Sequence, residues 1–178
     1  PIAAPALPEF TPAQDVQRGQ VALFTGCTGD LLQRRLLHDA RRLLSALGYA
    51  VHIPPQQGCC GALHVQQGDG ATARHLARQN LAAFPAEAEV ILTVASGCGA
   101  LLHEYDDLLE DERAAGFARR VTDINAFLAG LDWPETLMLR PLPQKVAVHE
   151  PCTLRHVLRG QQALYTLLRS IPQLEVVE

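Results

Sequence analysis

The 178-residue chain lacks the features of several large protein classes. Its 15 Lys and Arg against 19 Asp and Glu give a net charge of −4, which offers no attraction for nucleic acid or an anionic membrane. No apolar run approaches the roughly 20 residues of a membrane span, and no basic-then-apolar leader opens the sequence. A Gly-x-Gly-x-x-Gly loop for a flavin or nicotinamide is also missing. We therefore expect no nucleic-acid partner, no membrane span and no catalytic residue.

Two common cysteine patterns are absent as well. Structural zinc sites usually take their cysteines as Cys-x-x-Cys pairs, and the chain has none. A phosphatase-type Cys-x5-Arg loop is excluded because Gln33 lies six residues after Cys27 and Leu158 lies six after Cys152. Five cysteines are an odd number and too sparse for a secreted disulfide scaffold. We expect reduced thiols and a cytoplasmic location.

What the sequence does contain is an adjacent pair of cysteines between two glycines. A disulfide between neighbours in sequence strains both the bridge and the intervening peptide, so Cys59 and Cys60 are better explained as two thiolates that face a common target. Two further cysteines, Cys27 and Cys98, stand in glycine-rich turns of their own. The three turns together predict one metal site. Their glycines are Gly26, Gly58, Gly61, Gly97 and Gly99.

Apolar runs of strand length alternate with helical patterns along the chain. This alternation predicts an α/β fold with an open, mostly parallel sheet and helices on both faces. The expected strands cover residues 20–25, 49–53, 89–95, 145–149 and 174–177. Parallel strands bring their carboxyl ends to one edge, where such folds bind ligands. Cys27, Cys59, Cys60 and Cys98 each follow a strand, and so does Cys152. We expect the first four to converge there and Cys152 to face the same crevice.

The helical patterns are less sharply bounded. A helix that begins at Thr28 or Asp30 and stops at Gly48 would bury a stripe of four leucines. These are Leu32, Leu36, Leu43 and Leu47. A helix from about Asp69 to Phe84 has the same kind of stripe. Single helices are expected over 99–110 and 153–169.

The order of motifs indicates an internal repeat. Residues 145–149 followed by Cys152 echo residues 21–24 followed by Cys27. We therefore divide the chain into a proline-rich linker over 1–19, a first cysteine-rich repeat over 20–142 and the start of a second, truncated repeat over 143–178.

The residues alone leave the ligand of the site open. Thiolates select iron–sulfur clusters, zinc or Cu(I), and adjacent thiolates suit a cluster because neighbouring sulfurs can reach different iron atoms. Zinc and buried, inert cysteines remain alternatives. His64 and His103 could each donate to the site or be ordinary polar histidines. His149 beside Glu150 could serve Cys152 as a base, but such a pair needs a third group to hold the base, and sequence adjacency supplies none.

The combined motifs resemble a known family. The cysteine spacing resembles that of the CCG cysteine-rich domain, which occurs twice in one of the subunits of heterodisulfide reductase. It consists of Cys27, thirty-one intervening residues, the pair Cys59-Cys60 and a Ser-Gly-Cys98-Gly turn. The amino-acid sequences of four segments resemble those of the iron–sulfur subunit of glycolate oxidase (glycolate dehydrogenase). The segments are 21–27, 59–64, 95–105 and 146–152.

The resemblance implies an electron-transfer subunit of an oxidoreductase that is inactive alone. It implies a [4Fe–4S] cluster, cubane or non-cubane, on Cys27, Cys59, Cys60, Cys98 and Cys152, with the glycine-turn N–H groups directed at its sulfurs. The partner would be a flavoprotein that oxidises a 2-hydroxy acid such as glycolate.

The resemblance also implies a surrounding assembly. A ferredoxin-like domain would precede the linker, and partners would hold the chain at the inner face of the membrane. Leu101 stands where a full heterodisulfide reductase repeat has its last cysteine. A fragment prepared in air can be expected to lack the cluster. The alternatives are a heterodisulfide-reductase-like thiol–disulfide subunit and a zinc-binding module that docks a flavoprotein.

Overall fold

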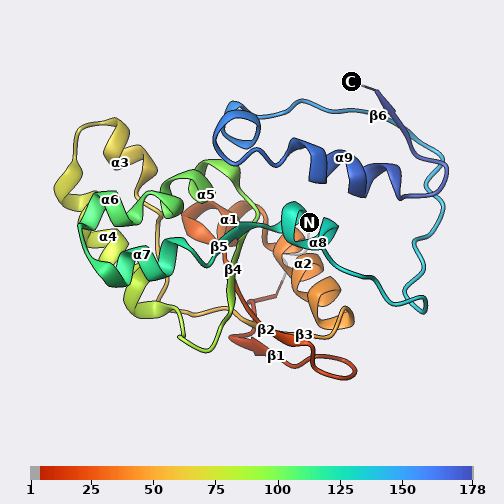
Figure 1. Ribbon diagram of the computed structural model, residues 1–178, viewed down its shortest axis with the longest axis horizontal. Helices are drawn as coiled ribbons and strands as arrows, with labels where there is room; N and C mark the ends of the chain where they lie inside the picture. The colour runs from red at the N-terminus through yellow and green to blue at the C-terminus, as the bar shows by residue number, and fades with distance from the viewer. Residues whose placement is uncertain (1–4, 178) are drawn as a thin grey trace.

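The main sheet has five strands, as the computed structural model, which describes residues 5–177, shows (Figure 1). In spatial order they are β1 (Phe10–Thr11), β3 (Tyr49–His52), β2 (Gly19–Phe24), β4 (Val90–Thr93) and β5 (Val121–Asp123). Strand β1 is antiparallel to β3, and all other neighbouring pairs are parallel. The predicted open, mostly parallel α/β sheet is confirmed.

Helices cover both faces of this sheet (Figure 1). Along β2 the side chains alternate. Val21 and Leu23 join the cluster packed by α2 (Arg34–Ala46) and α8 (Ile124–Ala129). Ala22 and Phe24 join the cluster packed by the helices from α4 (Gly70–Ala83) to α7 (Glu112–Ala118). Two apolar layers therefore sandwich a strand that is buried on both sides, as a continuous apolar run predicts. The helices are α1 (Gly26–Leu32), α2 (Arg34–Ala46), α3 (Ala62–Gln66), α4 (Gly70–Ala83), α5 (Ser96–His103), α6 (Tyr105–Leu109), α7 (Glu112–Ala118) and α8 (Ile124–Ala129).

The last part of the chain forms a small second sheet. Strands β6 (Lys145–Ala147) and β7 (Glu175–Val177) pair in parallel, apart from the main sheet, and α9 (Gln161–Arg169) packs against α8 (Figure 1). The single helix expected over 153–169 is wrong. A π-helical turn, η1 (Thr153–Val157), is separated from α9 because Arg159 takes a left-handed backbone conformation with φ 52°.

Two other expected helices also break. Gln33 ends α1 with φ −121°, so α2 begins a new register and buries Leu37, Ala40, Leu44 and Leu47. The first half of the expected leucine stripe is therefore wrong, with Leu32 82% and Leu36 48% exposed. The helix expected over 99–110 begins earlier, at Ser96, and divides into α5 and α6 at Glu104.

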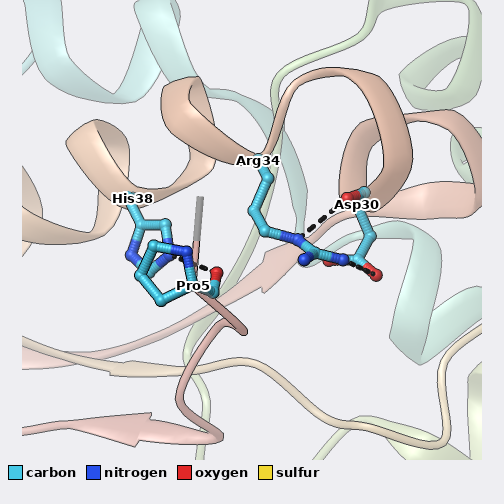
Figure 2. Close-up of polar contacts among 4 residues, drawn as sticks. All are labelled: Pro5, Asp30, Arg34 and His38. Atoms are coloured by element: carbon cyan, nitrogen blue, oxygen red, sulfur yellow. Dashed lines mark hydrogen bonds and ion pairs between the residues drawn. The ribbon is translucent and has the colours of Figure 1, made fainter. Parts of the chain in front are cut away.

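The segment expected to be a linker lies against the fold. Residues Phe10–Thr11 form β1, and the imidazole of His38 on α2 hydrogen-bonds the carbonyl of Pro5 at 2.9 Å (Figure 2). Beside it, the Arg34 guanidinium donates to the carboxylate of Asp30 at 3.0 Å. Residues 1–4 of the predicted linker lie outside the described residues. Among the helices over 5–177, none has the length and apolar character needed to cross a bilayer.

Candidate metal centre

Three neighbouring strands deliver the cysteines to one edge of the sheet. Cys27 lies in the first turn of α1 after β2, Cys59 and Cys60 follow β3, and Cys98 lies in the first turn of α5 after β4. Because β2 pairs with β3 on one side and with β4 on the other, the chain reverses direction across the sheet at β2. Open α/β sheets bind ligands at the carboxyl edge of such a reversal.

The sulfur atoms of these residues lie close together. The Sγ atoms of Cys60 and Cys98 are 3.3 Å apart, and the N–H of Gly61 donates to the Sγ of Cys59 at 3.4 Å. A Cβ added at Gly26 would lie 3.7 Å from the Sγ of Cys98, so the turn that carries Cys27 abuts Cys98. Cys60 and Cys98 are therefore in contact, and the turns of Cys27 and Cys59 lie beside them at the edge where the strand-end pattern places all four.

Cys27 and Cys59 open into a cavity of about 440 Å³. One wall is the start of α1, and another is the turn at Pro54 and Pro55. The N-terminal segment closes a third side with Leu7. Cys27 is exposed and Cys59 is half-buried, whereas Cys60 is only 4% exposed. The site thus has a buried side at Cys60 and an accessible side at Cys27.

The thiols of Cys59, Cys60 and Cys98 differ in pKa. The hydrogen bond between Cys60 and Cys98 lowers the pKa of Cys60 to about 6 and raises the pKa of Cys98, because the first thiolate to form accepts from the thiol that keeps its proton. Burial raises the pKa of Cys59 to about 11, and a hydrogen bond with Cys27 adds to that rise. Without a cation the cluster of sulfurs resists full ionisation, whereas thiolate ligation to a cation removes the protons.

Sequence reasoning missed the side chains that hold the cysteine loop. Gln57 spans the gap to β2: its Oε1 accepts from the N–H of Thr25 at 2.8 Å, and its Nε2 donates to the carbonyl of Leu23 at 3.2 Å. Asn80 on α4 and Tyr105 on α6 are fully buried and contact the backbone of the cysteine pair. Helical spacing could have found Asn80, since it lies three residues after Ala77 on the buried face.

The N–H groups of the five turn glycines differ in their hydrogen-bond partners. The N–H of Gly58 donates to Asn80 at 2.9 Å, and the N–H of Gly99 donates to the carbonyl of Ala95 at 2.9 Å. Gly61 directs its N–H at a cysteine sulfur. Gly26 and Gly97 lie in the first turns of α1 and α5, where helical N–H groups have no partner within the helix.

Cys152 and the three candidate histidines have surroundings unlike those of the other four cysteines. Cys152 is exposed at the start of η1, and its neighbour Thr153 shares a 2.7 Å hydrogen bond with Ser96 on the Cys98 helix. His64 faces Asp69, with Nδ1 3.5 Å from the carboxylate, as a polar histidine does. His103 and His149 are exposed.

The donor set fits a group that prefers sulfur. Four cysteines from three loops lie at one edge, and the hydrogen bond from Cys98 lowers the pKa of Cys60. As the side chains stand, no three His, Cys, Asp or Glu residues within 5–177 are disposed around one point to hold a single metal ion. Cys27, Cys59, Cys60 and Cys98 are the residues that would hold a bound group.

Comparisons with known proteins point to one family. The model of the CCG cysteine-rich domain matches residues 21–103, which contain all four converging cysteines. The "Probable glycolate oxidase iron-sulfur subunit" of Bacillus subtilis (strain 168) is 38% identical over 177 residues, covering 96% of this chain and 40% of that protein. The "Glycolate oxidase iron-sulfur subunit" of Escherichia coli (strain K12) is 34% identical over 151 residues, with coverage of 77% and 35%.

A shorter relative is covered more completely. The "Uncharacterized protein YkgE" of Escherichia coli (strain K12) is 30% identical over 166 residues, which cover 88% of this chain and 67% of that protein. The chain spans less than half of the other two relatives' length. No solved structure matches it. The matched domain and these relatives place the chain in the CCG cysteine-rich domain family.

Proposed function

We propose that this chain is the iron–sulfur, electron-transfer part of a flavin-dependent complex that oxidises a 2-hydroxy acid such as glycolate. The observation that carries the proposal is the convergence of Cys27, Cys59, Cys60 and Cys98 at the reversal point of the sheet. The names of two relatives support it, since one is a probable glycolate oxidase iron–sulfur subunit and the other a glycolate oxidase iron–sulfur subunit. A [4Fe–4S] cluster is the group we propose, with the flavoprotein as partner.

The chain's own residues would perform three tasks. Cys27, Cys59, Cys60 and Cys98 would bind the cluster as thiolates, and Cys152 is the proposed fifth thiolate from the second repeat. The N–H of Gly61, already directed at the Cys59 sulfur, would lower the electron density on that thiolate. The apolar layer around Cys60 would exclude water from the buried side. When bound, the cluster supplies reversible one-electron storage.

The test is the iron and acid-labile sulfide content per polypeptide after oxygen-free preparation. The Cys59→Ser, Cys60→Ser double variant should lose both and the visible absorbance, with its far-ultraviolet circular dichroism unchanged. Ser170→Ala, which removes a hydroxyl that donates to the Leu167 carbonyl at the end of α9, is the control and should retain iron. Iron in the double variant equal to that of the parent would remove the pair from the ligand set. Stoichiometric zinc without colour would favour the docking module.

The 3.3 Å approach of Cys60 and Cys98 favours a second candidate, a thiol–disulfide redox subunit. Here two thiols would form one disulfide and release two electrons and two protons to a disulfide substrate, which would be reduced to two thiols. Mass spectrometry after incubation with a small disulfide would reveal a Cys60–Cys98 bridge, and only this candidate requires its formation in each turnover.

A further inference from the structure

A buried polar network encloses the peptide groups next to the cysteine pair. Asn80 projects from α4 and Tyr105 from the start of α6, and each is 0% exposed. The Nδ2 of Asn80 donates to the hydroxyl of Tyr105 at 2.9 Å, so the two side chains form one unit. This unit lies inside the apolar layer made by α4 to α7, where an unpaired polar group would be costly.

The network engages three consecutive residues of the loop. The Oδ1 of Asn80 accepts from the N–H of Gly58 at 2.9 Å, and its Nδ2 donates to the carbonyl of Cys59 at 3.0 Å. The hydroxyl of Tyr105 donates to the carbonyl of Cys60 at 2.8 Å. Residues 58–60 belong to no helix or strand, so these side chains supply the hydrogen bonds that regular secondary structure would otherwise give.

The functional groups of Asn80 and Tyr105 match the backbone groups of residues 58–60 that they hydrogen-bond. An amide offers one acceptor and two donated protons on a planar group, and Asn80 uses both protons, on the Cys59 carbonyl and on the Tyr105 hydroxyl. Aspartate in its place has no proton to donate when ionised and a single one when protonated, so it could not make both bonds. Phenylalanine in place of Tyr105 would keep the ring stacked on Phe117, with centroids 5.5 Å apart, and would lose only the hydroxyl. Each contact can therefore be removed with little change of volume.

We propose that Asn80 and Tyr105 are positioning residues that fix the Cys59–Cys60 peptide and so aim both sulfurs at the ligand. Fixing the backbone fixes the Cα–Cβ directions of both cysteines. The proposal rests on the proposed function for its consequence in the loaded protein. The geometry of the metal-free thiols is a consequence that does not depend on iron.

The first measurement uses the metal-free protein. The site-resolved alkylation rates of Cys59 and Cys60 by iodoacetamide would be followed by mass spectrometry for the parent, Asn80→Asp and Tyr105→Phe. Both variants should alkylate Cys60 faster, because the buried side of the pair loses its anchor. Gln79→Ala is the control: it removes a bond to the Gln56 carbonyl of the same loop but does not touch the pair, and its rates should equal the parent's.

The second measurement uses protein loaded with iron and sulfide. Asn80→Asp should lose iron to a chelator on the order of tenfold faster than the parent, the usual range for groups that orient metal ligands. Tyr105→Phe should shift the visible spectrum and midpoint potential. Ile91→Val removes packing from the same layer without removing a hydrogen bond, and it should leave spectrum and potential unchanged. Restoring donor and acceptor by Asn80→Gln should recover part of the iron retention.

Two results would overturn the positioning role. One is alkylation of Cys60 at the parental rate in both Asn80→Asp and Tyr105→Phe. The other is a change of spectrum and potential in Ile91→Val as large as that in Tyr105→Phe, which would mean that both follow core packing alone. A parent that binds no iron would refute the proposed function, and the alkylation comparison would still decide the role of Asn80 and Tyr105.

Discussion

Gly61 joins the cysteine pair to α3 and offers a quantitative test of how tightly that junction is constrained. Its backbone is left-handed, with φ +93° and ψ −1°. An alanine Cβ there would meet the Cα, O and Cβ of Ala73 at 3.4 to 3.6 Å, which is ordinary van der Waals contact. The cost of Gly61→Ala is therefore the backbone conformation itself, about 1–2 kcal/mol for an L residue.

A matched control lies at the other end of the same helix. Gly68 is also left-handed, with φ +79°, and a Cβ there would meet nothing within 4 Å. Gly68→Ala should therefore lose the same free energy of unfolding as Gly61→Ala. For a chain of this size, a loss of about 1–2 kcal/mol lowers the melting temperature by about 2–8 °C. Thermal unfolding of the metal-free variants, followed by circular dichroism, measures both.

The two variants should differ in iron. Relief of the left-handed strain at Gly61 would rotate the peptide that follows Cys60 and move the N–H that donates to the Cys59 sulfur. Gly61→Ala should therefore release iron on the order of tenfold faster than Gly68→Ala. Equal release by the two variants would refute this reasoning. A melting temperature of Gly61→Ala equal to that of the parent would also refute it.

Two further predictions, each with a matched control substitution, test the remainder of the fold. The carboxylate of Asp123, which is 8% exposed, caps α8 by accepting from the N–H groups of Asn125 and Ala126. Asp123→Ala should therefore lower the free energy of unfolding, measured by chemical denaturation, by about 1 kcal/mol. Asp123→Asn should keep a free energy of unfolding near that of the parent. An Asn variant as unstable as the Ala variant would contradict the cap. A Cβ at Gly160 would lie 2.7 Å from the Cδ1 of buried Leu154, so Gly160→Ala should lower the free energy of unfolding by about 1–3 kcal/mol. Gly116→Ala inside α7 is the control, and it should leave the free energy of unfolding unchanged or raise it.

The strands and the meeting point of the cysteines could be predicted because both follow from local patterns. Continuous apolar runs such as Val21–Phe24 have no polar face to offer water, so they must lie between two layers. Parallel strands then bring their ends to one edge whatever the helices do. The expectation for Cys27, Cys60 and Cys98 needed nothing more than the order of strands and turns.

The helix breaks and the two-residue strand could not be predicted in the same way. Neither Gln33 nor Glu104 has a Gly or Pro beside it that would signal a helix end, yet α1 ends at the first and α5 at the second. Strand β1 is only two residues long, and its pairing with β3 is a tertiary contact. Propensity summed over such short segments is a weak guide compared with packing.

The supports of the site were hidden for a related reason. Asn80 lies 21 residues from Cys59 in sequence and Tyr105 lies 45 from Cys60, so neither belongs to a motif that includes its partner. Yet a polar residue on an otherwise apolar helical face must find partners inside the protein, and peptide groups of an irregular loop are what lack them. A buried asparagine opposite a cysteine loop is therefore a sign that the loop has one required shape. That requirement concerns the directions of Cys59 and Cys60, because the polar atoms of Asn80 contact the Gly58 N–H, the Cys59 carbonyl and the hydroxyl that holds the Cys60 carbonyl.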